Sequence, residues 1–154
     1  MLNRIRQMLV NDVAGPGATN KPGAVGTIRR ADPFAPVDDP TAPALSIVVV
    51  VYDMVVQSEN TLRSLMAGYQ QGVTEADYEV IVVENESPHC MRPEFIDSLP
   101  RNFSYYLRSE TEPTPVHAIN FALGLCRGEN ICLMIDGARM VTPGVVNYVL
   151  MGHQ

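Results

Sequence analysis

The chain has 154 residues, of which 46% are hydrophobic and 18% are charged, and its formal net charge is −6. This length and balance fit one soluble globular domain with a substantial core. The acidic charge argues against a general nucleic-acid-binding protein, which usually has a basic surface. Tryptophan is absent and the other aromatic residues are few, so there is no platform for stacking single-stranded bases.

The cysteine count and the hydropathy of the sequence indicate where in the cell the protein is located. Cys90, Cys126 and Cys132 form neither a C-x-x-C pair nor a metal-finger spacing. An odd number of cysteines in a chain of this size indicates reduced thiols. No apolar stretch approaches the ~20 residues that a membrane-spanning helix needs. The sequence therefore predicts a cytoplasmic protein with no transmembrane segment.

The first 44 residues differ in composition from the rest. Residues 11–44 are crowded with Gly, Pro, Ala, Asn and Asp, which are too small or too polar to offset the entropy of ordering. We therefore expect a flexible arm ahead of the domain. Leu2, Ile5 and Leu9 lie at helical spacing, so the first ten residues could form a short amphipathic helix that contacts a membrane surface or a partner. A frayed terminus is the alternative, because ten residues are few for an isolated helix.

The predicted domain spans residues 45–154 and begins with alternating strand and helix patterns. The β-branched run LSIVVVVYD at 45–53 predicts a strand that is covered on both faces. The helical pattern that follows has Ser58 as its expected N-cap and Gly72 as its expected end. The next run, YEVIVVEN at 78–85, predicts a second buried strand.

The second half of the domain continues this alternation. RPEFIDSL, with Pro93 in its first turn, predicts a short helix, and 103–109 predicts a weaker strand. TPVHAINFALGLCRG predicts a helix that opens with Thr114 as its cap and closes at Gly128. ENICLMID at 129–136 predicts a further strand, and TPGVVNYVLM repeats the Thr-Pro helix opening.

Regular alternation of strands and helices predicts an α/β fold with a mostly parallel, Rossmann-like sheet and flanking helices. In such sheets ligands bind outside the carboxyl ends of the strands, at the point where the strand order reverses. Three strands stop on acidic or amide side chains. These groups could form a shared cleft that binds a base or ribose and a cation beside phosphate oxygens. The alternative is that they only cap helices or shape turns. The strand-end residues are Tyr52, Asp53, Glu84, Asn85 and Asp136.

Motifs of several other enzyme classes are missing from the sequence. It contains no G-x-G-x-x-G, no G-x-x-x-x-G-K-[ST] and no G-x-S-x-G, which argues against a dinucleotide fold, a P-loop enzyme and a nucleophile elbow. His89 stands next to Cys90, but neighbouring residues seldom face one metal ion. Motifs alone therefore assign no catalytic group.

Five segments in order carry a family resemblance. LSIVVVVYDM resembles an opening strand that usually ends in Tyr-Asn, and ENTLRSL resembles the first helix that follows it. YEVIVVENES resembles a strand that normally ends Asp-Asp/Asn-Gly-Ser. AINFALGLCRGENICLMID resembles an Ala-x-Asn-x-Gly helix, a Gly-Glu pair and a strand that leads to Asp-x-Asp. From residue 45 to about 150 the chain thus resembles the nucleotide-binding half of the family 2 glycosyltransferases, which have the GT-A fold.

The resemblance implies a nucleotide-diphosphate sugar as the ligand and a role for each matching residue. Tyr52 and Asp53 would border the nucleotide pocket. Glu84, followed by Asn85, would accept hydrogen bonds from the base. Asn120 would support the sugar-phosphate side, and Asp136 would bind the ribose or a divalent cation, Mg²⁺ or Mn²⁺.

Three departures from the family pattern bear on this site. Glu84 is one methylene longer than the expected Asp, and Glu86 replaces a turn glycine. Ala138 stands where a second metal-facing Asp is expected, so we expect only weak metal dependence. Arg139 could instead grip a diphosphate with its guanidinium, although an ordinary solvent-facing arginine is the alternative interpretation.

These patterns leave two functions open. In the first, the domain binds a nucleotide-sugar donor for transfer of the sugar to an unknown acceptor. Nothing in the sequence is a credible general base, so we expect an apparently C-terminally truncated domain that is inactive on its own and catalytic within a longer chain. The alternative is a non-catalytic GT-A-like binding or assembly module.

Overall fold

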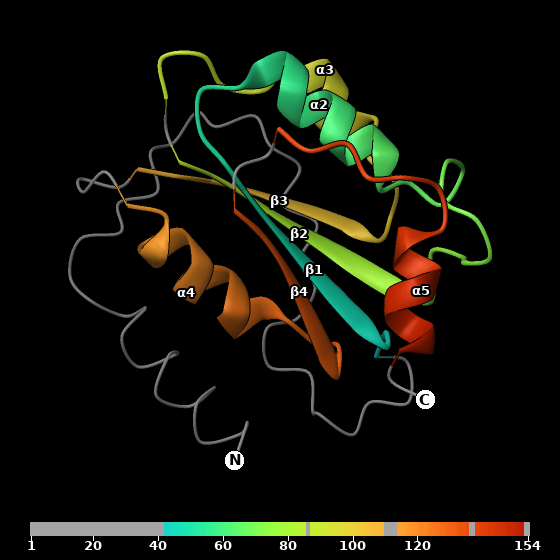
Figure 1. The fold of residues 1–154 in the computed structure, drawn as a ribbon. Coiled ribbons are helices and arrows are strands. Elements are labelled where there is room, and N and C mark those ends of the chain that lie inside the picture. Colours follow the sequence, from blue (N-terminus) through green and yellow to red (C-terminus); the bar gives the residue numbers. More distant parts are fainter. Residues whose placement is uncertain (1–41, 86, 110–113, 136–137, 153–154) are drawn as a thin grey trace.

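The computed structural model describes residues 42–85, 87–109, 114–135 and 138–152, so the predicted arm lies almost entirely outside the described residues. Strands and helices alternate from residue 45 onward (Figure 1). The strands are β1 (Leu45–Val51), β2 (Tyr78–Asn85), β3 (Phe103–Arg108) and β4 (Asn130–Ile135). The helices are α2 (Val55–Ser64), α3 (Pro93–Asp97), α4 (Val116–Leu125) and α5 (Val145–Met151).

The four strands form one parallel sheet in the order β3-β2-β1-β4. In the centre of the sheet, Val48 of β1 pairs with Ile81 of β2 on one side and with Leu133 of β4 on the other. Every residue of β1 is buried, as expected for a β-branched strand with helices over both faces. The predicted α/β fold with a Rossmann-like sheet is therefore confirmed.

Helices cover both faces of the sheet (Figure 1). On one face, α2, α3 and α5 pack over the sheet through side chains that include Leu62, Phe95 and Val146. On the other face α4 packs over β1 and β2. Its two fully buried residues, Ala118 and Ala122, are four positions apart and small, which lets the helix lie close to the strands. None of the helices in the described ranges is long and apolar enough to cross a membrane.

The predicted bounds of the first helix are wrong at both ends. Helix α2 begins at Val55, three residues before the expected cap, because the carbonyl of Met54 already accepts the N–H of Ser58 at 2.8 Å. Ser58 is buried inside the helix, and its hydroxyl has no partner among the described residues. The helix ends at Ser64, well before Gly72, and Gln70 holds this end by donating to the Ser64 carbonyl. Burial against the sheet thus outweighs the local cap signal.

Gly128 has a different role from the predicted helix end. Helix α4 ends at Leu125, and a Cβ atom on Gly128 would lie 2.5 Å from the backbone nitrogen of Ser46 in β1. The N–H of Gly128 donates to the Ser46 hydroxyl, which itself donates to the buried Glu79. Glycine is required here because two backbones meet. At the other end of α4, the expected cap Thr114 accepts the N–H of Val116 at 3.3 Å.

The start of α5 depends on a distant side chain. The helix begins at Val145, after the predicted Thr-Pro opening, and Gly144 precedes it with a φ of 96°. The buried Gln70 accepts the N–H groups of Gly144 and Val146 at 3.1 and 3.2 Å. Its amide nitrogen donates to the carbonyl of Thr142. Gln70, more than seventy residues away in the sequence, therefore caps the N-terminus of α5 in place of a local side chain.

Candidate functional site

The strand order places a candidate site between β1 and β4. β2 and β3 extend to one side of β1, and β4 lies on its other side, so the direction of the chain across the sheet reverses there. Val51 pairs with Glu84, and Val50 pairs with Ile135, so the strands end at one common edge. Ligands of open α/β sheets bind outside the carboxyl ends at such a reversal. The segments that follow β1, β2 and β4 therefore surround the candidate site.

Tyr52 and Asp53, directly after β1, are both exposed at this edge. Tyr52 is 58% exposed, an unusual placement for a large aromatic side chain beside a fully buried strand. Asp53 has a φ of 49°, in the left-handed region that Asp and Asn tolerate better than most residues. This backbone turn ends the strand. A phenol ring and a carboxylate are thus available to a ligand at the reversal point.

His89 joins Asp53 at this edge, and sequence reasoning missed the pair. Its Nδ1 lies 3.0 Å from an oxygen of Asp53, and its ring is largely exposed. The Ser87 hydroxyl, from the same loop after β2, donates to the His89 carbonyl at 3.0 Å. The two paired residues are 36 positions apart, so no spacing rule could have joined them. An imidazole oriented by a carboxylate can exchange a proton through its other nitrogen.

Glu84 is placed differently from the other strand-end residues. It is fully buried, and both carboxylate oxygens accept the N–H of Met91, at 3.2 and 3.1 Å. The Tyr105 hydroxyl donates to one of them at 2.5 Å. Burial raises the pKa of the Glu84 carboxyl above its usual range, and the hydrogen bonds from Tyr105 and Met91 oppose this shift. The predicted base contact remains a prediction, because a ligand must displace one of these donors to reach the carboxylate.

The remaining predicted residues are distributed more widely. The side-chain oxygen of Asn85 is buried and has no hydrogen-bond partner among the described residues. Asn120, on α4, and Arg139 are exposed, and no described contact joins either to Asp53 or Asn85. Asp136 lies outside the described residues. The structure therefore brings Tyr52, Asp53 and Asn85 to neighbouring strand ends and leaves the other roles as predictions.

The described part of the chain contains no ready-made cluster of metal ligands. Within it, no group of three or more His, Cys, Asp and Glu side chains could hold a metal ion. Ala138 is exposed and offers no ligand atom in its side chain. Asp136 accordingly stays a predicted ligand, and the paired groups of Asp53 and His89 are two donors, one fewer than such a cluster needs.

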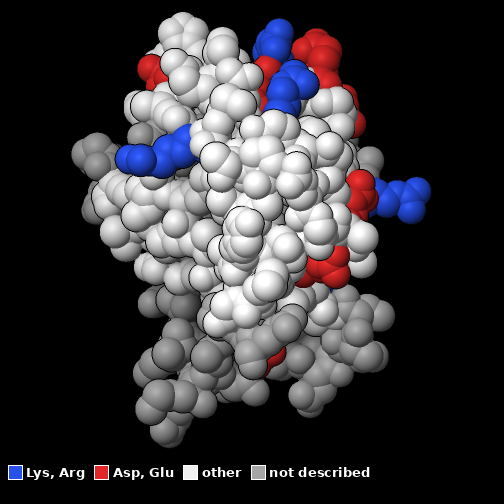
Figure 2. All heavy atoms as spheres, turned by 45° about the vertical axis from the view of Figure 1, so that its right-hand side comes forward, with Lys and Arg blue, Asp and Glu red and all other residues white. Residues whose placement is uncertain are grey.

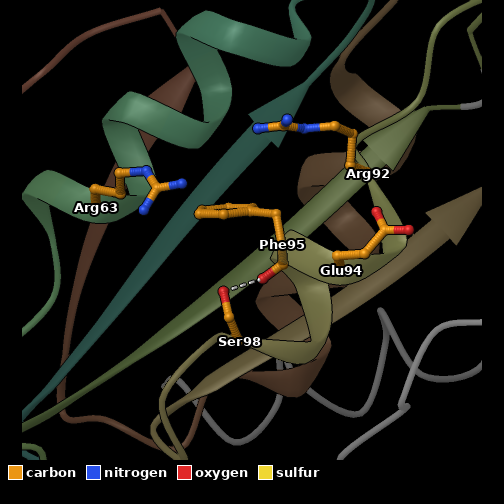
Figure 3. A pocket seen from close by; sticks show the side chains of 5 residues that line it. All are labelled: Arg63, Arg92, Glu94, Phe95 and Ser98. Carbon is orange, nitrogen blue, oxygen red and sulfur yellow. Dashed lines mark hydrogen bonds between the residues drawn. The ribbon is translucent and has the colours of Figure 1, made fainter.

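A separate hollow of about 400 Å³ lies in the helical layer, between α2 and α3. Figure 3 shows the guanidinium groups of Arg63 and Arg92 reaching toward the ring of Phe95. The Arg63 guanidinium lies 4.7 Å from the centre of that ring, a cation–π contact. Arg92 donates from two nitrogens to the buried Glu59. Glu94 also lines the hollow, so two acids balance the two arginines and the site has no net preference for anions.

The Glu59–Arg92 ion pair connects two parts of the helical layer. The hydrogen bond from Arg92 is the main cause that lowers the pKa of the Glu59 carboxyl, against the effect of burial. The pair joins α2 to the residue before α3. Sequence reasoning missed it, since the partners are 33 residues apart and neither belongs to a motif. We assign this cluster a structural role and keep the carboxyl ends of β1 and β4 as the candidate functional site.

Comparison with known proteins adds no further constraint. Neither the models of known protein families nor the curated proteins give a match to this chain. The resemblance to the family 2 glycosyltransferases therefore rests on the residues of the chain itself, and its functional consequences are proposals.

Proposed function

We propose that residues 45–152 bind a nucleotide-diphosphate sugar at the edge between β1 and β4, as the donor-binding part of a family 2 type glycosyltransferase. The observation that carries the proposal is the reversal of strand order beside β1, with Tyr52 and Asp53 exposed at it. The parallel sheet with helices on both faces supports the same reading. The proposed cytoplasmic location rests on the odd number of cysteines in the sequence.

The exposed groups fit the polar end of a nucleoside. The Asp53 carboxylate can accept hydrogen bonds from ribose hydroxyls or a base N–H, and the Tyr52 ring offers a surface for stacking. The side-chain oxygen of Asn85, at the next strand end, is buried and has no hydrogen-bond partner among the described residues, so it is an acceptor that a ligand could use. We place the exposed Asp53 in direct contact with the ligand and Asn85 beside it, with Glu84 behind them, because Glu84 already has its donors.

The diphosphate would lie toward the residues after β4. Asp136 is proposed to bind the ribose or one divalent cation, and Arg139 to bind phosphate oxygens. One protein carboxylate can suffice for Mg²⁺ when phosphates and waters complete its coordination. Asn120 is proposed to support the sugar-phosphate side from α4. The expected metal dependence is weak, since Ala138 contributes no second carboxylate.

One observation favours the alternative, a non-catalytic binding or assembly module. Glu84, at the position that the family resemblance assigns to base recognition, is sealed by Tyr105 and Met91. In this second reading the domain keeps the fold, its acid has become structural, and no sugar is transferred.

Calorimetric titration with a panel of nucleoside diphosphates, with and without Mn²⁺, tests the proposed binding site. Asp53→Asn keeps a residue that tolerates the left-handed backbone and removes the charge. It should weaken binding at least about tenfold, the equivalent of one charge-assisted hydrogen bond. Glu75→Gln is the matched control, because this exposed carboxylate precedes β2 at the opposite edge of the sheet. Absence of binding to every nucleotide, or equal affinities for wild type and Asp53→Asn, would contradict the proposed site.

A further inference from the structure

The contact between His89 and Asp53 brings a titratable ring to the carboxyl ends of the strands. The loop after β2 and the segment after β1 meet at this end of the sheet (Figure 1). The Nδ1 atom of His89 lies 3.0 Å from an oxygen of Asp53, and the two side chains are 77% and 40% exposed. A histidine ring changes its charge between about pH 5 and pH 8, where a carboxylate is ordinarily ionised. The pair therefore carries one negative charge at high pH and no net charge at low pH.

His89 is oriented for a contact with a ligand. Asp53 binds its Nδ1 atom, and the Nε2 atom on the other side of the ring has no hydrogen-bond partner among the described residues. The loop that carries the ring is anchored nearby, because the N–H of Met91 donates to both oxygens of the buried Glu84. The Ser87 hydroxyl also donates to the His89 carbonyl. The ring is thus held beside Asp53 with its second nitrogen available to a ligand.

Other titratable groups around this loop have contacts of their own. Glu84 accepts its hydrogen bonds inside the core, and the Cys90 thiol donates to the Ser87 carbonyl at 3.5 Å. Burial raises the pKa of the Glu84 carboxyl, so its charge changes at a higher pH than that of an ordinary carboxyl. Glu86 lies outside the described residues. The described titratable groups that contact the loop or Glu84 include Asp53, Glu59, Cys90, Arg92 and Tyr105. A variant that changes His89 alone is therefore needed to assign a pH dependence to it.

The arginines of the neighbouring helical layer do not supply an unbalanced positive charge. On the face that Figure 2 shows, basic and acidic side chains lie together at the top, at the level of α2 and α3. There Glu59 binds Arg92 and lies 3.9 Å from Arg63, and a second acid lines the same hollow. The chain as a whole has a net charge of −6, which repels an anionic ligand. A protonated His89 adds the positive charge that the described contacts of Asp53 otherwise lack.

We propose that His89 binds the nucleotide-diphosphate sugar through Nε2 and that protonation of the ring strengthens this binding, an inference that rests on the proposed function of the site. The protonated ring donates from both nitrogens, to Asp53 and to an oxygen of the ligand, and it offsets the charge of Asp53. The neutral ring has one N–H group, and the pair then keeps a negative charge that repels the phosphates. Acidification from pH 8 to pH 5.5 should therefore increase the affinity.

The exposure of the pair limits the size of the effect. Exposed ion pairs contribute less than buried charge-assisted hydrogen bonds, so the dissociation constant should fall about three- to tenfold over this range. Linkage requires that binding also takes up protons wherever the affinity rises on acidification. A merely structural role of His89 would not produce this uptake, because a structural loss weakens binding equally at each pH.

Calorimetric titration of the full chain at pH 5.5, 6.5 and 8, without added metal, measures both quantities. The ligands are diphosphate sugars of uridine, thymidine, guanosine, adenosine and cytidine. They carry no terminal phosphate group, which in a nucleoside diphosphate titrates at about pH 6 and would add its own pH dependence. Repeating the titration in buffers of different ionisation enthalpy counts the protons taken up. The wild type should bind about three- to tenfold more tightly at pH 5.5 than at pH 8 and take up protons at pH 6.5.

Three variants assign the effect to the charge of His89. His89→Gln should lose both the pH dependence and the proton uptake. His89→Lys carries a positive charge at all three pH values and should bind more tightly than His89→Gln at pH 8. His117→Gln removes the other histidine of the described residues and should keep the wild-type pH dependence.

The outcomes distinguish a failure of this inference from a failure of the proposed function. Wild-type pH dependence in His89→Gln would assign the effect to another group, such as Glu84, and would overturn the inference while the nucleotide site stands. A His89→Lys protein that binds no more tightly than His89→Gln at pH 8 would do the same. If no ligand of the panel binds the wild type at any pH, the proposed function fails and the inference fails with it.

Discussion

The substitution Tyr105→Phe tests the contribution of the buried Glu84 to stability most directly. The substitution removes one oxygen and keeps the ring that packs in the core. In the native protein that oxygen donates to the Glu84 carboxylate over 2.5 Å, and both residues are buried. Burial is the main cause that raises the pKa of the Tyr105 hydroxyl, and its hydrogen bond to Glu84 raises this pKa further. The phenol therefore stays protonated and remains the donor.

The expected loss follows from the kind of hydrogen bond. A hydrogen bond to a charged group contributes ~1.5–3 kcal/mol, so Tyr105→Phe should lower the free energy of unfolding by that amount at neutral pH. Tyr78→Phe removes a buried bond of 2.6 Å to the neutral carbonyl of Leu65 and should cost ~0.5–1.5 kcal/mol. Tyr148 is 70% exposed, and Tyr148→Phe should change stability by less than ~0.5 kcal/mol.

The cost of Tyr105→Phe should also depend on pH. The pKa of Glu84 is raised in the folded state, so its contribution is fully present below the unfolded pKa and is lost as pH rises through the folded pKa. The hydrogen bond from Tyr105 opposes this rise, so its removal raises the folded pKa further. The variant therefore loses more stability than the wild type as pH increases from about 4.3, the ordinary pKa of glutamate. The difference between the two should grow with pH and then level off.

Urea unfolding followed by circular dichroism, at several values from pH 4 to pH 8, measures both effects. The expected order of cost at neutral pH is Tyr105→Phe, then Tyr78→Phe, then Tyr148→Phe. A cost for Tyr105→Phe that is the same at every pH would refute the proposed contact with an ionisable Glu84. A cost no larger than that of Tyr148→Phe would show that the contact contributes nothing.

Three further variants test other parts of the structure. Gly128→Ala places a methyl group 2.5 Å from a backbone nitrogen of β1 and should lower the thermal midpoint sharply, whereas Gly124→Ala, in open space on α4, should stabilise by ~0.5–1 kcal/mol. Gln70→Ala should speed hydrogen exchange in α5 and leave α4 unchanged; equal protection of α5 in both proteins would exclude the remote cap. Arg92 lowers the pKa of Glu59, so the ion pair stabilises the fold above the ordinary pKa of glutamate, and this stability is lost as pH falls. Wild type and Arg92→Met should therefore differ in unfolding free energy at pH 7 and converge in acid.

The strands of the sheet could be predicted from the sequence because each is indicated by a run of neighbouring residues. Local apolar and aromatic runs, β-branched in β1 and β2, predicted all four strands to within two residues, with β2 at its observed bounds, 78–85. Helix ends could not be predicted as well, because contacts distant in sequence decide them. Ser58 has the chemistry of a cap but is buried within α2. The start of α5 is fixed by Gln70, which no pattern near Gly144 indicates.

The candidate site divides in the same way. Sequence position alone places Tyr52, Asp53 and Asn85 at strand ends, because parallel strands share one carboxyl edge. The contact of Asp53 with His89 could not be foreseen, since the loop after β2 folds back across the edge. The hydrogen bond from Tyr105 to Glu84 could not be predicted from the sequence either, because Tyr105 belongs to another strand, β3.

The alternation of side chains along β2 explains why Glu84 points toward the layer of α2 and α3. Successive strand residues point to opposite faces, and Val82 lies in the core beneath α2 and α3, so Glu84 points into the same layer. There it joins β2 to the N–H of Met91 and to Tyr105 on β3. Met91 ends the loop that carries His89 to Asp53. Glu84 thus fixes the far end of a loop that borders the proposed ligand site.

This arrangement predicts how Glu84 affects a bound nucleotide. If Glu84 acts by holding the loop, both Glu84→Gln and Tyr105→Phe should weaken nucleotide binding, because the first removes the charge and one acceptor oxygen of the contact and the second removes its donor. If the carboxylate touches the base, Tyr105→Phe should preserve or tighten binding, since it leaves the acid in place and frees one of its oxygens. Calorimetric titration of both variants distinguishes the two cases. We expect the affinity to fall in both, with Tyr148→Phe unchanged, because the buried carboxylate has no free face for a base.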